Sequence, residues 1–188
     1  IVSVGASNDY TKLGTTHHCF EDINILSSYE DINLFIPSNE KDFKYLFEKN
    51  YNNYSINYFR LSEKKIYFPI KSNGFIKNDK NKSLLILVGN SFDYNDLNKS
   101  KIDIFYINKI SKNMNFNFLN KYNKILIIEP YFGNVLERRI KKKIKKNNYI
   151  STVSYEETII HKYGKKKEQD RYLKFDKNNI LKRINNFF

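Results

Sequence analysis

The sequence predicts an α/β fold built as two units. Short apolar runs rich in β-branched and aromatic residues alternate along the chain with segments of helical period, a pattern typical of sheets covered by helices. A polar segment with one glycine and repeated Asn and Lys, residues 71–83, separates two such groups. We therefore expect a first unit over residues 1–70, a linker over 71–83 and a second unit over 84–188.

The first unit should begin with a short strand and continue with helices and strands in turn. In its clearest helix, "EKDFKYLFEKN", Phe43, Leu46 and Phe47 recur at helical spacing and predict an apolar face. Strands are expected where residues that favour β structure dominate a short run. The expected strands are 1–5, 32–37, 54–61 and 65–70, and the expected helices are 21–29 and 40–50.

The second unit should contain a mainly parallel sheet. Three of its strands, including "LLILVG" and "KILIIEP", are almost entirely apolar, as expected for strands that are buried on both faces under helices. A helix is indicated by Leu136, Ile140 and Ile144, which form one apolar stripe in a charged run. The expected strands are 84–89, 102–107, 124–130 and 149–155, and the expected helices are 135–146 and 178–188.

The composition limits the class of protein. The chain has 188 residues, 40% of them apolar and 16% aromatic, and can therefore bury a substantial core. It has no apolar run of about 18 residues, so we expect no membrane span. The sequence shows no charged-then-apolar leader before a small-residue cleavage site, so we expect no signal peptide. The single cysteine excludes an internal disulfide and is typical of the reducing cytoplasm, where we expect the protein.

The net charge of +13 is compatible with nucleic-acid binding but does not specify it. Most of the excess is Lys, whereas Arg, which reads phosphates and bases through two parallel hydrogen bonds, is scarce. The densest basic run, 137–146, carries the apolar stripe of the helix described above. We therefore expect a solvated helical face and no specific nucleic-acid site.

The segment "KLGTTHHCFEDINIL", residues 12–26, contains the candidate site. His17, His18 and Cys19 are consecutive, so their side chains diverge and cannot share a zinc ion, and the same geometry disfavours a cysteine nucleophile with its own base. No metal site is expected. The segment instead reads as a loop entering a helix, in which Glu21 and Asp22 suit the positive helix end. The histidines are then either polar residues at a helix entrance or imidazoles presented to a substrate.

This region resembles one known enzyme family. The run "LGTTHHCFEDINILSSYEDINLFIPSNEKDFKYLF", with "YSINYFRLSEK" after it, is similar to the second half of the pyrimidine-binding domain of the thiamine diphosphate-dependent transketolase family. Members carry a Gly-x-Thr-His step, a Glu-Asp-Ile helix and a later strand with an Arg-Leu end. The runs "LLILVGN", "ILIIEPYFGNVLERRI" and "HKYGKKKEQDRYLKFDKNNILKRI" resemble the C-terminal domain of the same family.

The resemblance implies a function for particular residues. It implies that His17 is catalytic and binds substrate through a carbonyl or hydroxyl oxygen, that His18 also lies at the substrate, and that Arg60 binds a substrate phosphate. For Arg60, a salt bridge that closes the domain is the alternative. The implied reaction is the transfer of a two-carbon ketol unit between sugar phosphates, with thiamine diphosphate and a divalent metal such as Mg²⁺.

The resemblance also implies that other chains or domains are needed. The family's cofactor-activating glutamate and its Gly-Asp-Gly metal motif have no match in these residues, so the residues that bind cofactor are unknown here. We expect a part or subunit of a longer enzyme, inactive alone, that acts as a homodimer or with a diphosphate-binding subunit. The alternatives are a beta-type subunit of a 2-oxo acid dehydrogenase, a deoxyxylulose phosphate synthase-like enzyme, and a non-catalytic partner subunit.

Overall fold

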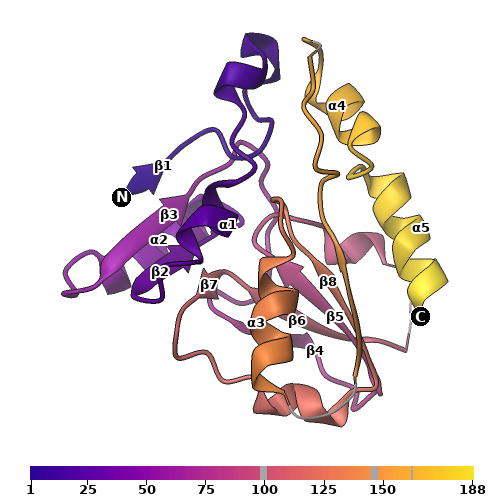
Figure 1. Ribbon diagram of the computed structural model, residues 1–188. Helices are drawn as coiled ribbons and strands as arrows, with labels where there is room; N and C mark the ends of the chain where they lie inside the picture. Colours follow the sequence, from indigo (N-terminus) through magenta and orange to yellow (C-terminus); the bar gives the residue numbers. More distant parts are fainter. Residues whose placement is uncertain (98–100, 145–147, 162) are drawn as a thin grey trace.

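The computed structural model describes residues 1–97, 101–144, 148–161 and 163–188, and its strands form two sheets (Figure 1). The smaller sheet has the order β1-β3-β2-β7. Its first three strands are parallel, and β7 pairs with β2 in the antiparallel sense. The strands are β1 (Val2–Ser3), β2 (Ile32–Phe35), β3 (Ile56–Arg60) and β7 (Lys109–Ile110).

The larger sheet has the order β4-β6-β5-β8-β9. Strands β6, β5, β8 and β9 are parallel to one another. At one edge, β4 pairs with β6 in the antiparallel sense. The strands are β4 (Gly74–Lys77), β5 (Ser83–Val88), β6 (Asp103–Ile107), β8 (Lys124–Ile128) and β9 (Tyr149–Val153). Mainly parallel strands with interleaved helices confirm the predicted α/β class.

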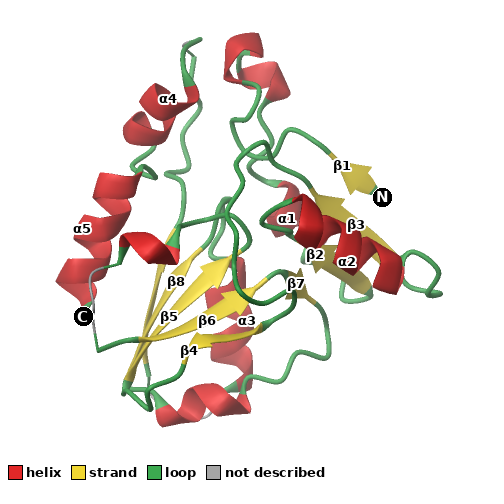
Figure 2. Cartoon of the chain, turned by 180° about the vertical axis from the view of Figure 1, so that it is seen from behind, coloured by secondary structure: helices red, strands yellow, loops and turns green. Residues whose placement is uncertain are grey.

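Helices cover both faces of the larger sheet. In Figure 1 α3 crosses in front of the strands, and in Figure 2 it lies behind them, whereas α4 and α5 stand along the other side. The side chains of β5 explain this arrangement: Leu84 and Ile86 pack with α3, and Leu85 and Leu87 pack with α5, as alternation along a strand requires. The helices are α1 (Asp22–Leu26), α2 (Glu40–Asn50), α3 (Val135–Lys143), α4 (Lys166–Tyr172) and α5 (Lys177–Phe187).

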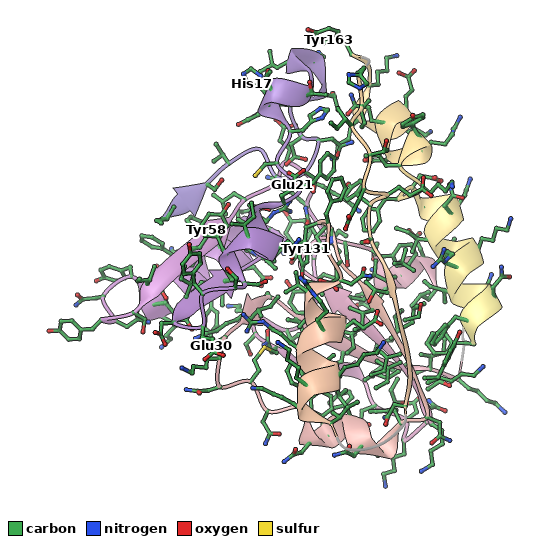
Figure 3. All side chains as sticks on the ribbon, in the orientation of Figure 1. His17, Glu21, Glu30, Tyr58, Tyr131 and Tyr163 are labelled. Carbon is green, nitrogen blue, oxygen red and sulfur yellow. The ribbon has the colours of Figure 1, made fainter. Side chains whose placement is uncertain are left out.

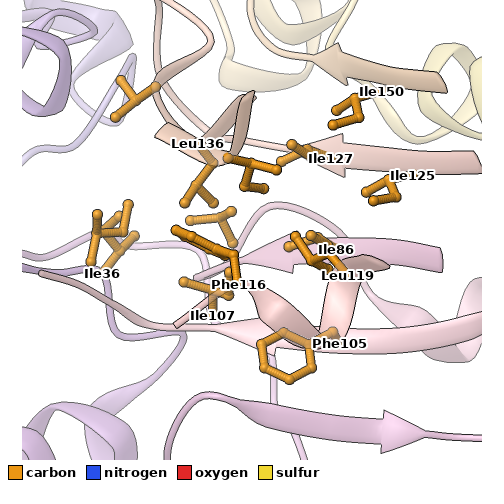
Figure 4. Close-up of a cluster of buried hydrophobic side chains, with 14 of the residues drawn as sticks. Ile36, Ile86, Phe105, Ile107, Phe116, Leu119, Ile125, Ile127, Leu136 and Ile150 are labelled. Atoms are coloured by element: carbon orange, nitrogen blue, oxygen red, sulfur yellow. The ribbon is translucent and has the colours of Figure 1, made fainter. Parts of the chain in front are cut away.

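One apolar cluster joins the two sheets. Ile36 from the end of β2 packs in the same buried cluster as Ile86, Ile127 and Leu136 (Figure 4). The backbone also comes close here, because a Cβ on Gly89 would stand 2.4 Å from Cγ2 of Ile36. The smaller sheet therefore packs on the larger one through a shared apolar core, and not only through the connecting chain.

Three local expectations differ from the structure. Residues 65–70 form no strand, because the segment pairs with no neighbouring strand. It buries Ile66, and its Pro69 has no N–H to donate to a strand ladder. Residues 71–83, expected as a linker, contain β4 and the start of β5. The sequence also gave no indication of α4. The division into two units itself stays a prediction.

Helix α3 ends at Lys143, within the predicted helix over 135–146, whose residues 145 and 146 lie outside the described part. Among residues 1–97, 101–144, 148–161 and 163–188, no helix has the length and apolar character needed to cross a membrane.

Candidate functional site

A loop that leaves the small sheet carries the predicted histidines. It contains two short 3-10 helices, Thr11–Leu13 and Thr15–His17, separated by Gly14. Gly14 has φ +82°, a left-handed conformation that favours glycine, which explains why the turn needs it. Two backbone hydrogen bonds of 2.8 Å between Ser7 and Cys19 close the base of the loop. We call residues 8–18 the histidine loop; it projects at the top of Figure 1.

His17 is exposed near the outer end of this loop (Figure 3). Its Nδ1 lies 3.0 Å from Oγ1 of Thr16. If the hydroxyl donates this bond, the ring proton sits on Nε2, which then faces outward as a hydrogen-bond donor. The geometry suits a group that contacts a ligand from outside, and it does not suit a residue that supports a core.

His18 is the half-buried neighbour. Its ring meets Phe20 edge-on, with the ring centroids 5.8 Å apart, and its Nε2 has no hydrogen-bond partner within the described residues. Burial lowers the pKa of His18; the charge of Lys166 and that of His17 lower it further, while Glu21 opposes them. The imidazole is therefore held neutral at pH 7 and points inward, unlike that of His17.

Arg60 lies below the histidine loop and is only 2% exposed. Its Nε donates to both carboxylate oxygens of Asp22, at 3.0 and 2.9 Å. Its Nη2 donates to Oγ of Ser7 at 3.0 Å and to the carbonyl of Cys19 at 2.8 Å. These contacts match the salt-bridge interpretation of Arg60. A phosphate bound by Nε and Nη2 would have to displace these partners.

The three predicted site residues therefore do not share one surface. His17 and His18 lie next to each other on the loop but face outward and inward respectively, and Arg60 ties the base of the loop to α1. Asp22, considered in the sequence only as a charge at the helix start, is the common acceptor here. It also accepts a hydrogen bond of 2.8 Å from the hydroxyl of Tyr58.

A second polar group beneath the loop escaped sequence reasoning. We call Asn8, Asp9, Tyr155, Lys166 and Asp170 the Lys166 cluster. Nζ of Lys166 lies 3.1 Å from Oδ1 of Asp9 and also donates to Oδ1 of Asn8. Asn8 donates to Asp170 at 2.9 Å, and the Tyr155 hydroxyl donates to the same carboxylate at 3.3 Å. Lys166 lies between Lys165 and Lys167 in the sequence, so no local signal distinguishes it.

Glu129 directly follows β8, an inner strand of the larger sheet, in a fully buried position. Burial raises its pKa to about 7, whereas hydrogen bonds from Tyr131 and from the Leu136 amide act in the opposite direction. Its oxygens lie 3.3 and 3.4 Å from that amide, at the start of α3. The carboxylate therefore anchors the first turn of α3.

The residues that the structure describes include possible metal ligands. Within the described ranges, no group of three or more His, Cys, Asp or Glu side chains is placed to hold a metal ion. Tyr10, near the start of the loop, packs on Gly5, where a Cβ would stand 2.3 Å from the ring. The described residues therefore provide no ligand set for the metal ion that accompanies thiamine diphosphate.

Comparison with known proteins identifies the fold. No family model matches the chain, and no curated protein matches it in sequence. Solved structures do match, and the fold is transketolase-like. Transketolase from Leishmania mexicana superposes with a TM-score of 0.78 at 7% identity, over 99% of this chain and 30% of that chain. The transketolase from Pichia stipitis in complex with sedoheptulose 7-phosphate gives 0.75 at 11% identity, over 98% and 29%.

A split-gene transketolase extends the comparison. Its structure, described as an inactive β4 tetramer, matches 100% of this chain with a TM-score of 0.75 and 10% identity, and this chain covers 65% of it. The chain thus spans about a third of the full-length transketolases and a larger share of the split-gene chain. At these identities the match establishes an α/β fold like the C-terminal region of transketolase.

Proposed function

We propose that this chain is a part or subunit of a cytoplasmic transketolase-like transferase that moves a two-carbon ketol unit between sugar phosphates. The observation that carries the proposal is the exposed His17 imidazole on a braced loop of a transketolase-like fold. The Pichia stipitis enzyme, whose complex with a sugar phosphate shares this fold, supports the substrate class. The motif resemblance around residues 13–47 supports the reaction.

In this proposal His17 donates a hydrogen bond from Nε2 to a substrate oxygen. A carbonyl or hydroxyl oxygen that gains negative charge during the reaction is stabilised by a fixed donor, and the effect is large where water is excluded. Thr16 holds the other ring nitrogen and so selects the orientation of the ring. His18 is proposed to line the substrate from the inner side as a neutral imidazole.

The proposal keeps Arg60 as a phosphate-binding residue on one condition. The guanidinium must exchange Asp22 for the substrate phosphate, because its Nε and Nη2 are both occupied in the free chain. If the exchange occurs, loss of Arg60 should raise KM for phosphorylated sugars and leave non-phosphorylated substrates nearly unaffected. If it does not, loss of Arg60 should lower stability alone.

Thiamine diphosphate and Mg²⁺ would be supplied with other domains or chains. The ring chemistry belongs to that cofactor, and the residues of this chain contribute substrate contacts. We therefore propose that the protein acts as a homodimer or with a diphosphate-binding subunit, and that the isolated chain binds thiamine diphosphate weakly. Calorimetry with the cofactor and magnesium measures this, and tight binding by the chain alone would contradict it.

The decisive experiment is ketol transfer by the chain together with its natural partner subunit. We expect His17→Ala to reduce kcat/KM by a factor equivalent to about 2–4 kcal/mol, the scale for losing one oxyanion donor. Lys12→Ala, an exposed change on the same loop, should keep full activity. Full turnover by His17→Ala would show that the Thr-Thr-His-His step is only a helix entrance.

One observation favours a second candidate, a non-catalytic partner subunit. Nε and Nη2 of Arg60 are bonded inside the chain, and a subunit that only supports assembly has no need to release them. In that case the complex should form but show no ketol transfer, and neither His17→Ala nor Arg60→Ala should change that result.

A further inference from the structure

The histidine loop and its base are held mainly by the second unit. Just before the loop, the hydroxyl of Ser7 donates to the carbonyl of Pro130 at 2.6 Å. From the end of the loop, the ring of Phe20 stacks on Phe132 with centroids 4.6 Å apart, and the Phe132 amide donates to the Phe20 carbonyl at 3.0 Å. These contacts fix the two points where the chain enters and leaves the loop, but they leave its interior unsupported.

The interior of the loop is held by the Lys166 cluster. The side chain of Asp9 is fully buried, and its two oxygens lie near Nζ of Lys166 and the amide of Glu63. Asn8 is also fully buried and is bound on both ends of its amide, by Lys166 and by Asp170. Lys166 is thus the one residue of this cluster that contacts both loop residues, and it comes from the first turn of α4, far away in sequence.

We propose that Lys166 is a positioning residue for the histidine loop: from α4 it binds Asn8 and Asp9 and so holds His17 at a fixed place on the second unit. The inference rests on the proposed function, since it gives the second unit a task in presenting the substrate-binding imidazole. Lys166 does not touch the substrate. It acts through the backbone of residues 8–18.

The energetics make this a local effect. A buried ion pair contributes little net stability, because removing both charges from water costs about as much as their attraction returns. The ion pair instead fixes the position of the loop, because only one arrangement of the two side chains brings their charges together. Gly14 adds a second restraint from the same side, since its Cα faces the ring of Tyr163, where a Cβ would stand 2.8 Å from Cε1 (Figure 3 labels this tyrosine at the tip).

His18 reports on the position of Lys166. Besides burial, the charges that act on His18 are those of Lys166 and His17, which lower its pKa, and that of Glu21, which raises it. Asp9 and Asp170 lie next to Lys166. The charges of Lys166, Asp9 and Asp170 also act on the pKa of Lys64.

The test compares three variants of the 188-residue chain. Lys166→Met/Asp9→Asn removes the ion pair without leaving a buried carboxylate unpaired, Lys166→Arg keeps the charge, and Lys167→Met removes an exposed charge from the neighbouring position. Amide hydrogen exchange is followed at Leu13, His17 and His18, whose N–H groups are bonded within the loop, and at β5 as an internal control. The pKa of His18 is followed by NMR titration.

We expect the double variant to speed exchange in the loop by about tenfold or more while β5 is unchanged, as for a local opening. The pKa of His18 should rise in the double variant, because the Lys166 charge that lowers it is removed. Lys166→Arg, which keeps the charge, should match the wild type in loop exchange and in the pKa of His18. Lys167→Met should match the wild type. Unchanged loop exchange in the double variant would overturn the proposal, and so would equal changes in β5, which would indicate general destabilisation.

These readouts do not depend on ketol transfer. If the loop loosens in the double variant but His17→Ala retains full turnover in the assembled enzyme, the positioning role stands and the proposed function fails. If His17→Ala loses turnover and the loop does not respond to Lys166, the proposed function stands and the positioning role fails.

Discussion

The histidine loop and the larger sheet are stabilised by different means. The sheet is held by strand ladders and by alternating apolar side chains that α3 and α5 cover. The loop has almost no regular pairing, and its place depends on a few polar groups: Arg60 with Asp22 at the base and the Lys166 cluster in the interior. The comparison shows that many weak apolar contacts position the frame, whereas single residues position the candidate site. Substitutions should separate the two regions.

The largest expected effect is at the base of the loop. Asp22→Ala removes the carboxylate that faces Nε of Arg60 and leaves a guanidinium, 2% exposed, without its counter-charge. Breaking one side of a buried pair costs about 3–5 kcal/mol of unfolding free energy. Urea denaturation measures it. Asp22→Ala/Arg60→Met, which removes both charges, should recover a large part of the loss; if it is as unstable as the single variant, the ion pair is not the cause.

The core of the larger sheet should respond next. Ile127 is fully buried between β5 and α3, so Ile127→Ala removes three carbons and leaves a cavity. The expected loss is about 3 kcal/mol, within the usual range for such truncations. Thermal and urea unfolding check it against Ile25→Ala, at a residue 61% exposed, which should lose less than about 0.5 kcal/mol. Equal losses at the two sites would contradict the assignment of the core.

The pH dependence of the unfolding free energy tests the connection between β8 and α3, where Glu129 is buried. Glu129 has a folded pKa raised to about 7 from an ordinary value of 4.5. Its stabilising contribution is therefore complete below pH 4.5 and is lost as the pH rises through about 7, where the buried group must ionise. Glu129→Gln keeps an acceptor for the Leu136 amide but cannot ionise. Relative to the wild type it should gain up to about 3 kcal/mol between pH 4.5 and pH 8.

Unfolding free energies at a series of pH values give this difference. Glu137→Gln, which changes a carboxylate in the first turn of the same helix, serves as the control and should not reproduce this difference. A difference between Glu129→Gln and the wild type that does not change with pH would show that Glu129 is solvated or paired in solution.

The contrast also explains what the sequence could predict. The strands β5, β6 and β8 are near-continuous apolar runs, and the pattern located each within about two residues. Helix α4 was missed because "KKEQDRY" has almost no apolar stripe: its inner face is polar, with Gln169 buried and Lys166 and Asp170 in the cluster. Residues 65–70 were predicted as a strand from their apolar residues. An unpaired segment can bury apolar side chains as well, and Ile66 is buried in this way.

The candidate site divides in the same way. His17 and His18 were found because a short motif carries them, whereas the packing of His18 against Phe20 and the charge of Lys166 that lowers its pKa became visible with the structure. For Arg60, the strand end was predicted, but its partner was not, since Asp22 is 38 residues away. Long-range polar pairs leave no periodic trace in a single sequence, so the residues that hold the loop required the structure.

The smallest expected effect on stability is at the tip of the loop. His17 is exposed, and its side-chain hydrogen bond goes to its neighbour Thr16, so truncation removes no buried contact. His17→Ala should change the unfolding free energy by less than about 0.5 kcal/mol, the usual range for surface substitutions away from special features. His18→Ala should cost more, because that ring is half-buried against Phe20. Urea denaturation of both variants at pH 7 gives the comparison. A loss at His17 as large as that at His18 would place the imidazole inside the fold in solution, where it could not be offered to a substrate.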